Sequence, residues 1–127
     1  MKIRVGAAVV FSLACAAINA MAQSGDVERG ERTFNQQCKL CHTVEKGGAN
    51  KVGPNLFGMF GRKAGTAEGF SFSSAMQKSG IAWDDKTLAE YLADPKNRLP
   101  GGKMVYMGLK KQDQLDDVIA YLKKATQ

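Results

Sequence analysis

Histidine and cysteine are scarce in this 127-residue sequence: His42 is its one histidine, and there are three cysteines. A single histidine leaves no second imidazole for a peroxidase site to use in cleaving an O–O bond. Between Gly47 and Gly69 regular alternation of apolar and polar residues is also missing, which indicates loops and not β-strands. The basic residues form no dense cluster, so nucleic acid is a poor candidate as a partner.

Long apolar runs are absent except near the N-terminus. A charged start is followed by an apolar run from Val5 to Ile18 and by an A-x-A triplet that ends at Ala22. This pattern predicts that residues 1–22 are a signal peptide, cleaved before Gln23, and that residues 23–127 form a single domain. The apolar run is short for a membrane span, which needs about 20 residues, so an uncleaved anchor is the weaker alternative.

The most informative segment is Cys38-Lys39-Leu40-Cys41-His42. Two cysteines three positions apart, followed at once by a histidine, are the attachment motif of a c-type haem. Each thiol adds across one vinyl group of the porphyrin, and the histidine places an imidazole beneath the iron. Such attachment takes place outside the cytoplasmic membrane in bacteria, which agrees with the predicted leader. We expect a periplasmic protein that binds one haem c through Cys38 and Cys41, with His42 as an iron ligand.

A zinc site and a thioredoxin-like redox pair are the alternatives for this motif. A structural zinc site uses four protein ligands, mostly Cys and His. Cys15 lies in the leader, so the rest of the chain offers only Cys38, Cys41 and His42, and a fourth ligand would have to be a carboxylate. A thioredoxin-like pair needs a βαβ setting, and no convincing apolar strand run flanks the motif. Haem attachment is the favoured interpretation.

Helical spacing and end signals predict an all-α domain. Three clear helices are expected, over residues 26–37, 84–93 and 113–125, with a shorter helical turn around 73–78. In the first of them Gly30 lowers helix stability by about 1 kcal/mol relative to alanine, so we expect another backbone to pack against it. Glycine-rich loops separate the helices and are expected to wrap around the haem. The expected apolar wall consists of Leu56, Phe57, Met59 and Phe60.

The second axial ligand of the iron decides the chemistry. An open position would bind small molecules or activate oxygen, whereas a thioether closes the site and favours electron transfer. Four methionines follow the leader: Met59, Met76, Met104 and Met107. Met104 is the favoured ligand because a Pro-Gly-Gly loop precedes it and because it lies far from His42 in sequence. Met107 and Met76 remain alternatives, since most methionines only fill gaps in cores.

The sequence resembles the class I cytochromes c of the short, mitochondrial-like kind. The segments that match the family pattern, in order, are Cys38–Gly48, Gly53–Leu56, Gly61–Lys63, Pro100–Met104 and Ile119–Ala125. The resemblance covers essentially the whole chain after the leader. It implies the small cytochrome c fold, in which helices and glycine-rich loops surround one covalently bound haem.

The resemblance also implies roles for individual residues. Met104 would be the distal iron ligand, and Pro54 would supply a carbonyl to the second ring nitrogen of the histidine ligand. Arg62 and Trp83 would hydrogen-bond a haem propionate. Tyr91 would reach the sulfur of the methionine.

Three positions depart from the family pattern. Phe72 stands where tyrosine is usual, Met76 where asparagine is usual, and Gly102 where threonine is usual. Each difference removes a polar group from the network behind Met104. We therefore expect a looser ligand loop, from which Lys103 can displace Met104 as the pH rises.

The function implied by the resemblance is one-electron transfer, not enzymatic catalysis. A soluble, monomeric periplasmic carrier would take electrons from a bc1-type complex and pass them to a cytochrome c oxidase or a similar acceptor. Without the leader the chain has 16 basic and 12 acidic side chains, a net charge of +4, which favours acidic partners. Lysines that the family places around the haem edge match Lys51, Lys96, Lys103, Lys110 and Lys111.

The competing interpretation is a haem peroxidase or a gas-binding sensor of the cytochrome c′ type. A cytochrome c′ carries its attachment motif near the C-terminus and has no methionine ligand. Here the motif follows the first predicted helix. Its position therefore favours the electron carrier.

Overall fold

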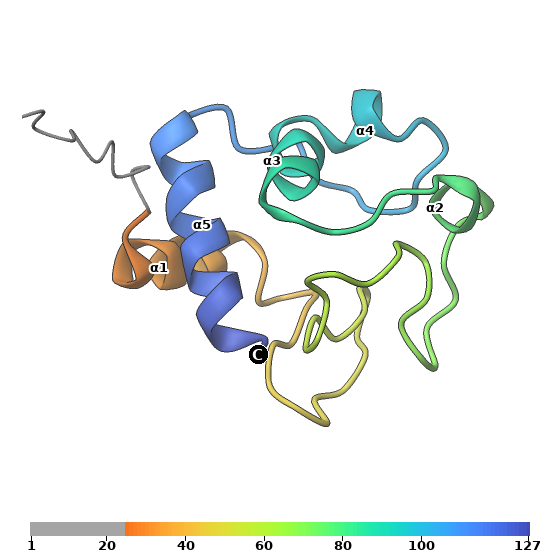
Figure 1. The fold of residues 1–127 in the computed structure, drawn as a ribbon, viewed down its shortest axis with the longest axis horizontal. Helices are drawn as coiled ribbons and strands as arrows, with labels where there is room; N and C mark the ends of the chain where they lie inside the picture. Colours follow the sequence, from red (N-terminus) through yellow and green to blue (C-terminus); the bar gives the residue numbers. More distant parts are fainter. Residues whose placement is uncertain (1–24) are drawn as a thin grey trace, which may run out of the picture.

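The computed structural model describes residues 25–127, in which five helices are joined by irregular segments of different lengths and no strand is present (Figure 1). The helices are α1 (Val27–Gln37), α2 (Ser74–Lys78), α3 (Asp85–Ala93), α4 (Pro95–Arg98) and α5 (Gln112–Ala125). The predicted all-α fold is confirmed. The predicted signal peptide, residues 1–22, lies outside the described residues. Within residues 25–127, no helix combines the length and the apolar character that a membrane span requires.

Side-chain caps begin the helices α1, α2 and α3. The carboxylate of Asp26 accepts a hydrogen bond from the Arg29 N–H at the start of α1. The Ser73 hydroxyl accepts from the Met76 N–H at the start of α2. At α3, the Asp84 carboxylate accepts from the Thr87 N–H while the Thr87 hydroxyl accepts from the Asp84 N–H, a reciprocal capping box. These three boundaries are therefore fixed by local chemistry.

The short helix α4 is not among the predicted elements. Pro95 ends α3 at Ala93, as expected, because a proline disfavours helical conformation in the residue before it. The same proline begins α4, since a fixed φ and a missing N–H suit the first turn of a helix. A residue that stops one helix thus starts the next one.

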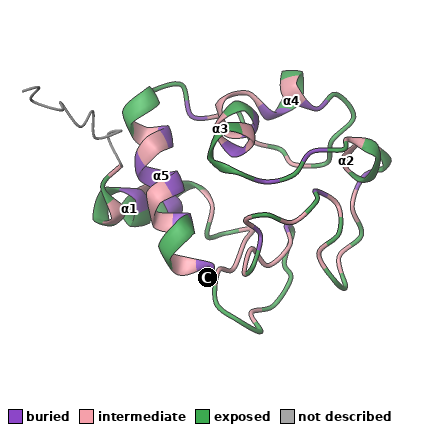
Figure 2. Ribbon diagram, viewed as in Figure 1, coloured by how far each residue is buried: buried purple, intermediate pink, exposed green. Residues whose placement is uncertain are grey.

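Helices α1 and α5 cross closely, and the crossing depends on a glycine. A Cβ built on Gly30 would lie 1.9 Å from the backbone oxygen of Asp117, so only glycine fits there. Beside it, the rings of Phe34 and Tyr121 pack with their centroids 5.4 Å apart. Figure 2 shows buried residues on the face of α5 that crosses α1. The expected backbone contact at Gly30 is confirmed.

An ion pair also joins these helices. The guanidinium of Arg29 donates to both carboxylate oxygens of Asp117, at 2.9 and 3.1 Å, and the Asp26 N–H donates to the same carboxylate at 2.7 Å. Asp117 is buried, whereas Arg29 is largely exposed. The apolar spacing of α5 predicts its buried Leu115, Val118, Ile119 and Leu122, but it gives no sign that Asp117 is buried as well.

The loop between α1 and α2 is held to the rest of the domain through its backbone. The Gly61 N–H donates to the Trp83 carbonyl, and the Trp83 N–H donates to the Arg62 carbonyl. Earlier in the same loop the Gly58 N–H donates to the Thr126 carbonyl, just past α5. These bonds fix the loop without regular secondary structure and leave a cavity between it and the helices.

Candidate functional site

One cavity, of about 250 Å³, brings the predicted site residues together. Its walls come from the end of α1, the long loop before α2, the helices α2, α3 and α5, and the segment between α4 and α5. All the residues named as site residues from the sequence line it: Cys38, Cys41, His42, Pro54, Arg62, Trp83, Tyr91 and Met104. Of the expected apolar wall, Leu56 and Met59 line the cavity but Phe57 and Phe60 do not.

The attachment motif continues from the last turn of α1. The Cys38 N–H donates to the Phe34 carbonyl and caps the helix, and the N–H groups of Cys41 and His42 both donate to the Cys38 carbonyl. This turn directs both thiols and the imidazole toward one cavity. Both cysteines are half-buried free thiols, and burial raises the pKa of Cys38 to about 11.

The position of His42 leaves one nitrogen available as a ligand. Its Nδ1 lies 2.8 Å from the Pro54 carbonyl oxygen. Because a carbonyl only accepts hydrogen bonds, Nδ1 carries the proton and Nε2 carries a lone pair. Burial lowers the pKa of His42, against the raising effect of the Pro54 bond, and so favours the neutral ring. A neutral imidazole with a free Nε2 is the form that binds iron.

Gly53 sets the space beside that imidazole. A Cβ at this position would lie 2.3 Å from the Cε1 of His42, so a larger residue would displace the ring. The Gly53 N–H donates to the Cys41 carbonyl at 2.8 Å, which ties the loop to the attachment motif. The Gly53-Pro54 pair thus holds the histidine through one backbone hydrogen bond and one close approach.

The structure separates the methionine candidates. Met104 and Met76 are half-buried and line the cavity, and the buried Met59 lines it as well. Met107 is 86% exposed and does not line it, so the structure does not support Met107 as a ligand. Met104 reaches the cavity from the segment between α4 and α5, whereas His42 reaches it from the loop after α1.

Two buried side chains at the cavity have polar atoms that bond to none of the described residues. Trp83 and Tyr91 are 9% and 6% exposed, and their rings pack with centroids 5.3 Å apart. Burial raises the pKa of Tyr91. None of the described residues has a buried side-chain polar atom without a partner, so the indole N–H and the phenol are accessible and can donate to a group bound in the cavity. Together with two thiols, an imidazole and a thioether, they fit a haem c.

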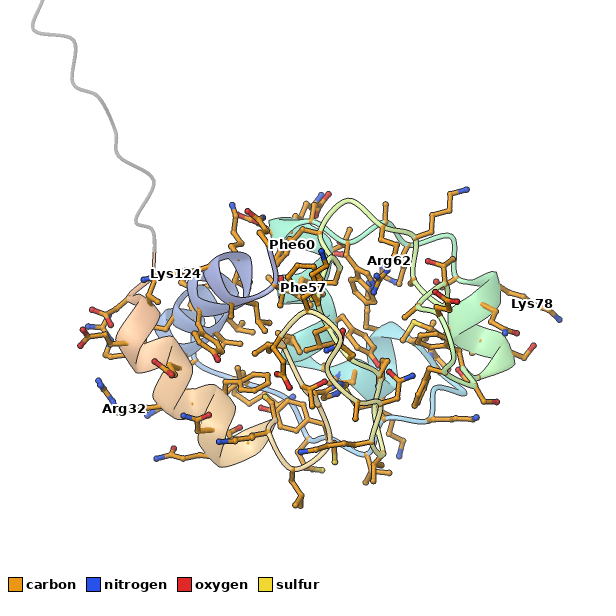
Figure 3. All side chains as sticks on the ribbon, turned by 90° about the horizontal axis from the view of Figure 1, so that it is seen from below. Arg32, Phe57, Phe60, Arg62, Lys78 and Lys124 are labelled. Atoms are coloured by element: carbon orange, nitrogen blue, oxygen red, sulfur yellow. The ribbon has the colours of Figure 1, made fainter. Side chains whose placement is uncertain are left out.

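Arg62 lies at the same wall of the cavity. One of its guanidinium nitrogens donates to the Phe57 carbonyl at 3.3 Å. Figure 3 places Arg62 beside Phe57 and Phe60, away from Arg32 and Lys78 at the ends of the molecule. Arg62 is half-buried and lines the cavity, so its charge is available there.

The three departures from the family pattern all lie near Met104. Phe72 and Met76 line the cavity, and the Phe72 ring packs edge-on against Phe70 at 4.8 Å between centroids. The Gly102 N–H donates to the Leu99 carbonyl at 3.1 Å, which forms a turn before the methionine. Lys103 donates from Nζ to the Ser71 carbonyl at 2.7 Å, so in this structure its amine ties the ligand loop to the chain before α2.

Two cavity residues, Gln37 and Tyr106, are not indicated by the sequence motifs. The Tyr106 hydroxyl donates to the Oε1 of Gln37 at 2.5 Å. Burial raises the pKa of Tyr106 to about 12. The one available signal is the alternation after Met104, in which Val105 and Met107 are exposed and Tyr106 is half-buried.

Three of the five predicted rim lysines line one depression. Lys96, Lys103 and Lys110 surround a second depression whose lining includes Met104. Lys51 donates from Nζ to the Lys39 carbonyl, within the attachment motif. Lys111 precedes α5 and lines neither depression. Among residues 25–127, no three His, Cys, Asp or Glu side chains are grouped as the zinc alternative would require.

Comparison with known proteins identifies a family that matches nearly all of the described residues. The family model described as "Cytochrome c" matches residues 27–126. A cytochrome c of Chlamydomonas reinhardtii is 52% identical over 107 residues, which are 84% of this chain and 96% of that protein. A cytochrome c of Gibberella zeae is 51% identical over 102 residues, which are 80% of this chain and 96% of that protein. A cytochrome c of Guizotia abyssinica is 49% identical over 107 residues, which are 84% of this chain and 96% of that protein.

The cofactor and the general role follow from the motif together with these matches. The family binds one covalent haem c, and Cys38 and Cys41 fit its attachment motif. The proteins of this family transfer electrons and are not enzymes. The match extends from the first residue of α1 to the residue after α5. The chain belongs to the cytochrome c family.

Proposed function

We propose that this protein is an exported one-electron carrier in which His42 and Met104 are the two axial ligands of the haem iron. Haem c, when bound, supplies the one-electron couple of Fe(II) and Fe(III). The observation that carries the proposal is that an imidazole and a thioether from separate segments line one cavity, with both attachment cysteines beside the imidazole.

On the proximal side the chain orients the ligand before it binds. Pro54 fixes the proton of His42 on Nδ1 and thereby leaves Nε2 to bind the metal. A carbonyl partner on the second nitrogen also increases the basicity of the ligand. Gly53 limits the position of the ring by its close approach.

On the distal side a thioether favours electron transfer over substrate chemistry. Met104 would occupy the sixth position, close it to small molecules and stabilise Fe(II). Tyr91 would donate its free hydroxyl toward the methionine sulfur. Arg62 and Trp83 would donate to a haem propionate, which needs partners of this kind when it is buried. Apolar side chains such as Leu56 and Met59 would keep water out.

The partners and the location complete the proposal. Lys96, Lys103 and Lys110 around the second depression, with Lys51 and Lys111, would attract acidic surfaces on a bc1-type donor and on an oxidase or similar acceptor. The periplasmic location rests on residues 1–22 as a cleaved leader, which leaves residues 23–127 as one domain. The intact mass of the exported protein tests this part: it should equal residues 23–127 plus one haem.

The ligand assignment is tested by spectra of the wild type and Met104→Ala in both redox states, with carbon monoxide added to the reduced protein. The wild type should resist carbon monoxide, because the sixth position is filled, and Met104→Ala should bind it readily. Met76→Ala and Met107→Ala are matched controls that should behave as the wild type does. A wild type that binds carbon monoxide readily would favour the gas-binding or peroxidase alternative. Identical spectra for the wild type and Met104→Ala would refute Met104 as the ligand.

A further inference from the structure

Gln37 and Tyr106 join two parts of the chain that lie 69 positions apart. The Tyr106 hydroxyl donates to the Gln37 side-chain oxygen at 2.5 Å. Gln37 is the last residue of α1 and directly precedes the first attachment cysteine. Tyr106 follows the proposed distal ligand by two positions, and both residues line the cavity. The bond therefore runs between the proximal and the distal sides of the site.

The chain around Tyr106 is extended, and its side chains alternate between cavity and solvent. Val105 and Met107 are 101% and 86% exposed, while Met104 and Tyr106 are half-buried. Leu109 is buried again, at 3% exposure. Tyr106 is thus the polar side chain that this segment turns inward next to the methionine.

Other hydrogen bonds of residues 103–110, which we call the ligand segment, reach only the distal half of the domain. Lys103 donates to the Ser71 carbonyl before α2, the Leu109 N–H donates to the Leu92 carbonyl of α3, and Lys110 donates to the Ala93 carbonyl. Among the hydrogen bonds of the described residues, Tyr106 to Gln37 is the one that joins the ligand segment to α1. A ligand segment without it would be tied at its ends but not across the cavity.

We propose that Tyr106 and Gln37 form a latch that holds the ligand segment closed across the cavity, which makes Tyr106 a positioning residue for Met104. The inference rests on the proposed ligation by Met104. Opening of the segment breaks this hydrogen bond, so the bond favours the closed arrangement. Loss of the bond shifts the equilibrium toward the open arrangement. The net stabilisation by one hydrogen bond corresponds to a change of about two- to tenfold in the population of the open arrangement.

The test is a titration of the ferric holoprotein with imidazole, an external ligand that competes with the methionine. Tyr106→Phe keeps the ring and removes the hydroxyl, and it should raise the apparent imidazole affinity by about two- to tenfold. Gln37→Leu should do the same, and the double variant should show no further gain, because both changes break one bond. Gln37→Glu keeps an acceptor oxygen and should retain the affinity of the wild type. Tyr121→Phe, a change of the same kind on α5, is the matched control and should have no effect.

Three results would overturn the latch: a Tyr106→Phe affinity equal to that of the wild type, additive effects in the double variant, or a Gln37→Glu variant that behaves like Gln37→Leu. Amide hydrogen exchange in residues 104–109 gives a second readout that does not depend on the iron ligand. Tyr106→Phe should accelerate this exchange by a similar factor, and unchanged exchange would also refute the latch. If the wild type and Met104→Ala bind imidazole with equal affinity, the proposed ligation by Met104 is wrong. In that case the hydrogen-exchange rates still test the latch, because they do not depend on the iron ligand.

Discussion

The backbone of Gly53 lies in contact with the imidazole of His42, since a Cβ there would stand 2.3 Å from Cε1 and within 2.8 Å of both ring nitrogens. No side chain is accommodated at such a distance without movement. The space around the proximal histidine is therefore set by a residue that has no side chain of its own.

Gly53→Ala should destabilise the holoprotein by about 2–3 kcal/mol, because the added methyl group must displace the ring of His42. The bond from Nδ1 to the Pro54 carbonyl would lengthen at the same time. Denaturant unfolding of the purified holoprotein measures the loss. The control is Gly47→Ala, where a Cβ meets nothing within 4 Å but φ is +74°. Only backbone strain of about 1–2 kcal/mol acts at that position. A smaller loss for Gly53→Ala than for Gly47→Ala would contradict the steric explanation.

Gly30→Ala should also destabilise the protein, although alanine is the better helix former by about 1 kcal/mol. The new Cβ would lie 1.9 Å from the backbone oxygen of Asp117, so α1 and α5 would have to separate. We expect a net loss of about 1–3 kcal/mol in the free energy of unfolding. Gln36→Ala, at an exposed position of the same helix, should change it by less than about 0.5 kcal/mol. An unchanged or increased stability for Gly30→Ala would show that the two helices adjust without loss.

Asp117→Asn tests the ion pair between α1 and α5. The hydrogen bond from Arg29 lowers the pKa of Asp117 below its ordinary value of 3.8, although burial acts in the opposite direction. A carboxyl whose pKa is lower in the folded state stabilises the protein above the unfolded pKa and loses this effect as the pH falls through the folded pKa. At neutral pH the free energy of unfolding of the wild type should exceed that of Asp117→Asn by about 1–2 kcal/mol. The exposure of Arg29 limits the size of this difference.

The pH dependence distinguishes this pair from general acid sensitivity. The difference between the wild type and Asp117→Asn should shrink as the pH falls below about 4. Asp85→Asn removes an exposed pair with Lys123, whose side chains are 60% and 48% exposed, and should have little effect at any pH. A constant difference from neutral to acid pH would mean that the charge of Asp117 is not what stabilises the crossing.

Replacement of Lys96, Lys103 and Lys110 by glutamine should slow electron exchange with a purified oxidase about tenfold at low salt. Attraction between exposed charges is screened at high ionic strength, so the rates of the variant and of the wild type should converge there. Stopped-flow measurement over a series of salt concentrations gives the rates at low and at high ionic strength. Reduction by an uncharged small molecule should be the same for the two proteins.

A second triple variant controls for net charge alone. Lys46, Lys78 and Lys124 are exposed and lie outside the second depression. Their replacement by glutamine changes the net charge by the same amount and should slow the reaction much less. Equal slowing by both triple variants would argue against a localised docking surface.

The helix boundaries can be predicted because they depend on neighbours in the sequence. Asp26, Ser73 and Asp84 each cap a helix through a bond to a residue three positions later, and such bonds are visible as spacing. Helix α4 escapes prediction because the stop signal of Pro95 hides its second role as a helix start. The positions of the cavity residues come from the family resemblance, since no local rule places Trp83 beside Tyr91.

Contacts between distant residues with ordinary side chains cannot be predicted in this way. Arg29 and Asp117 lie 88 positions apart, and each is a common surface residue type. Gln37 and Tyr106 form their bond only because the fold brings the end of α1 to the ligand segment. The prediction that Phe57 lines the cavity rests on hydrophobicity alone, which does not determine the direction of a side chain in an irregular loop, and the same holds for Phe60.

The burial of Cys38 has a consequence for the order in which the protein is assembled. Thiolate, not thiol, is the reactive form of cysteine. In the folded chain the pKa of Cys38 rises from 9.0 to about 11, which makes its thiolate fraction near neutral pH about a hundredfold smaller. The same residue caps α1 through its backbone N–H, so its half-buried side chain is held at the end of that helix, beside the cavity. The thiol is therefore more reactive in a chain that has not yet folded, which favours attachment of the cofactor before the domain closes around it.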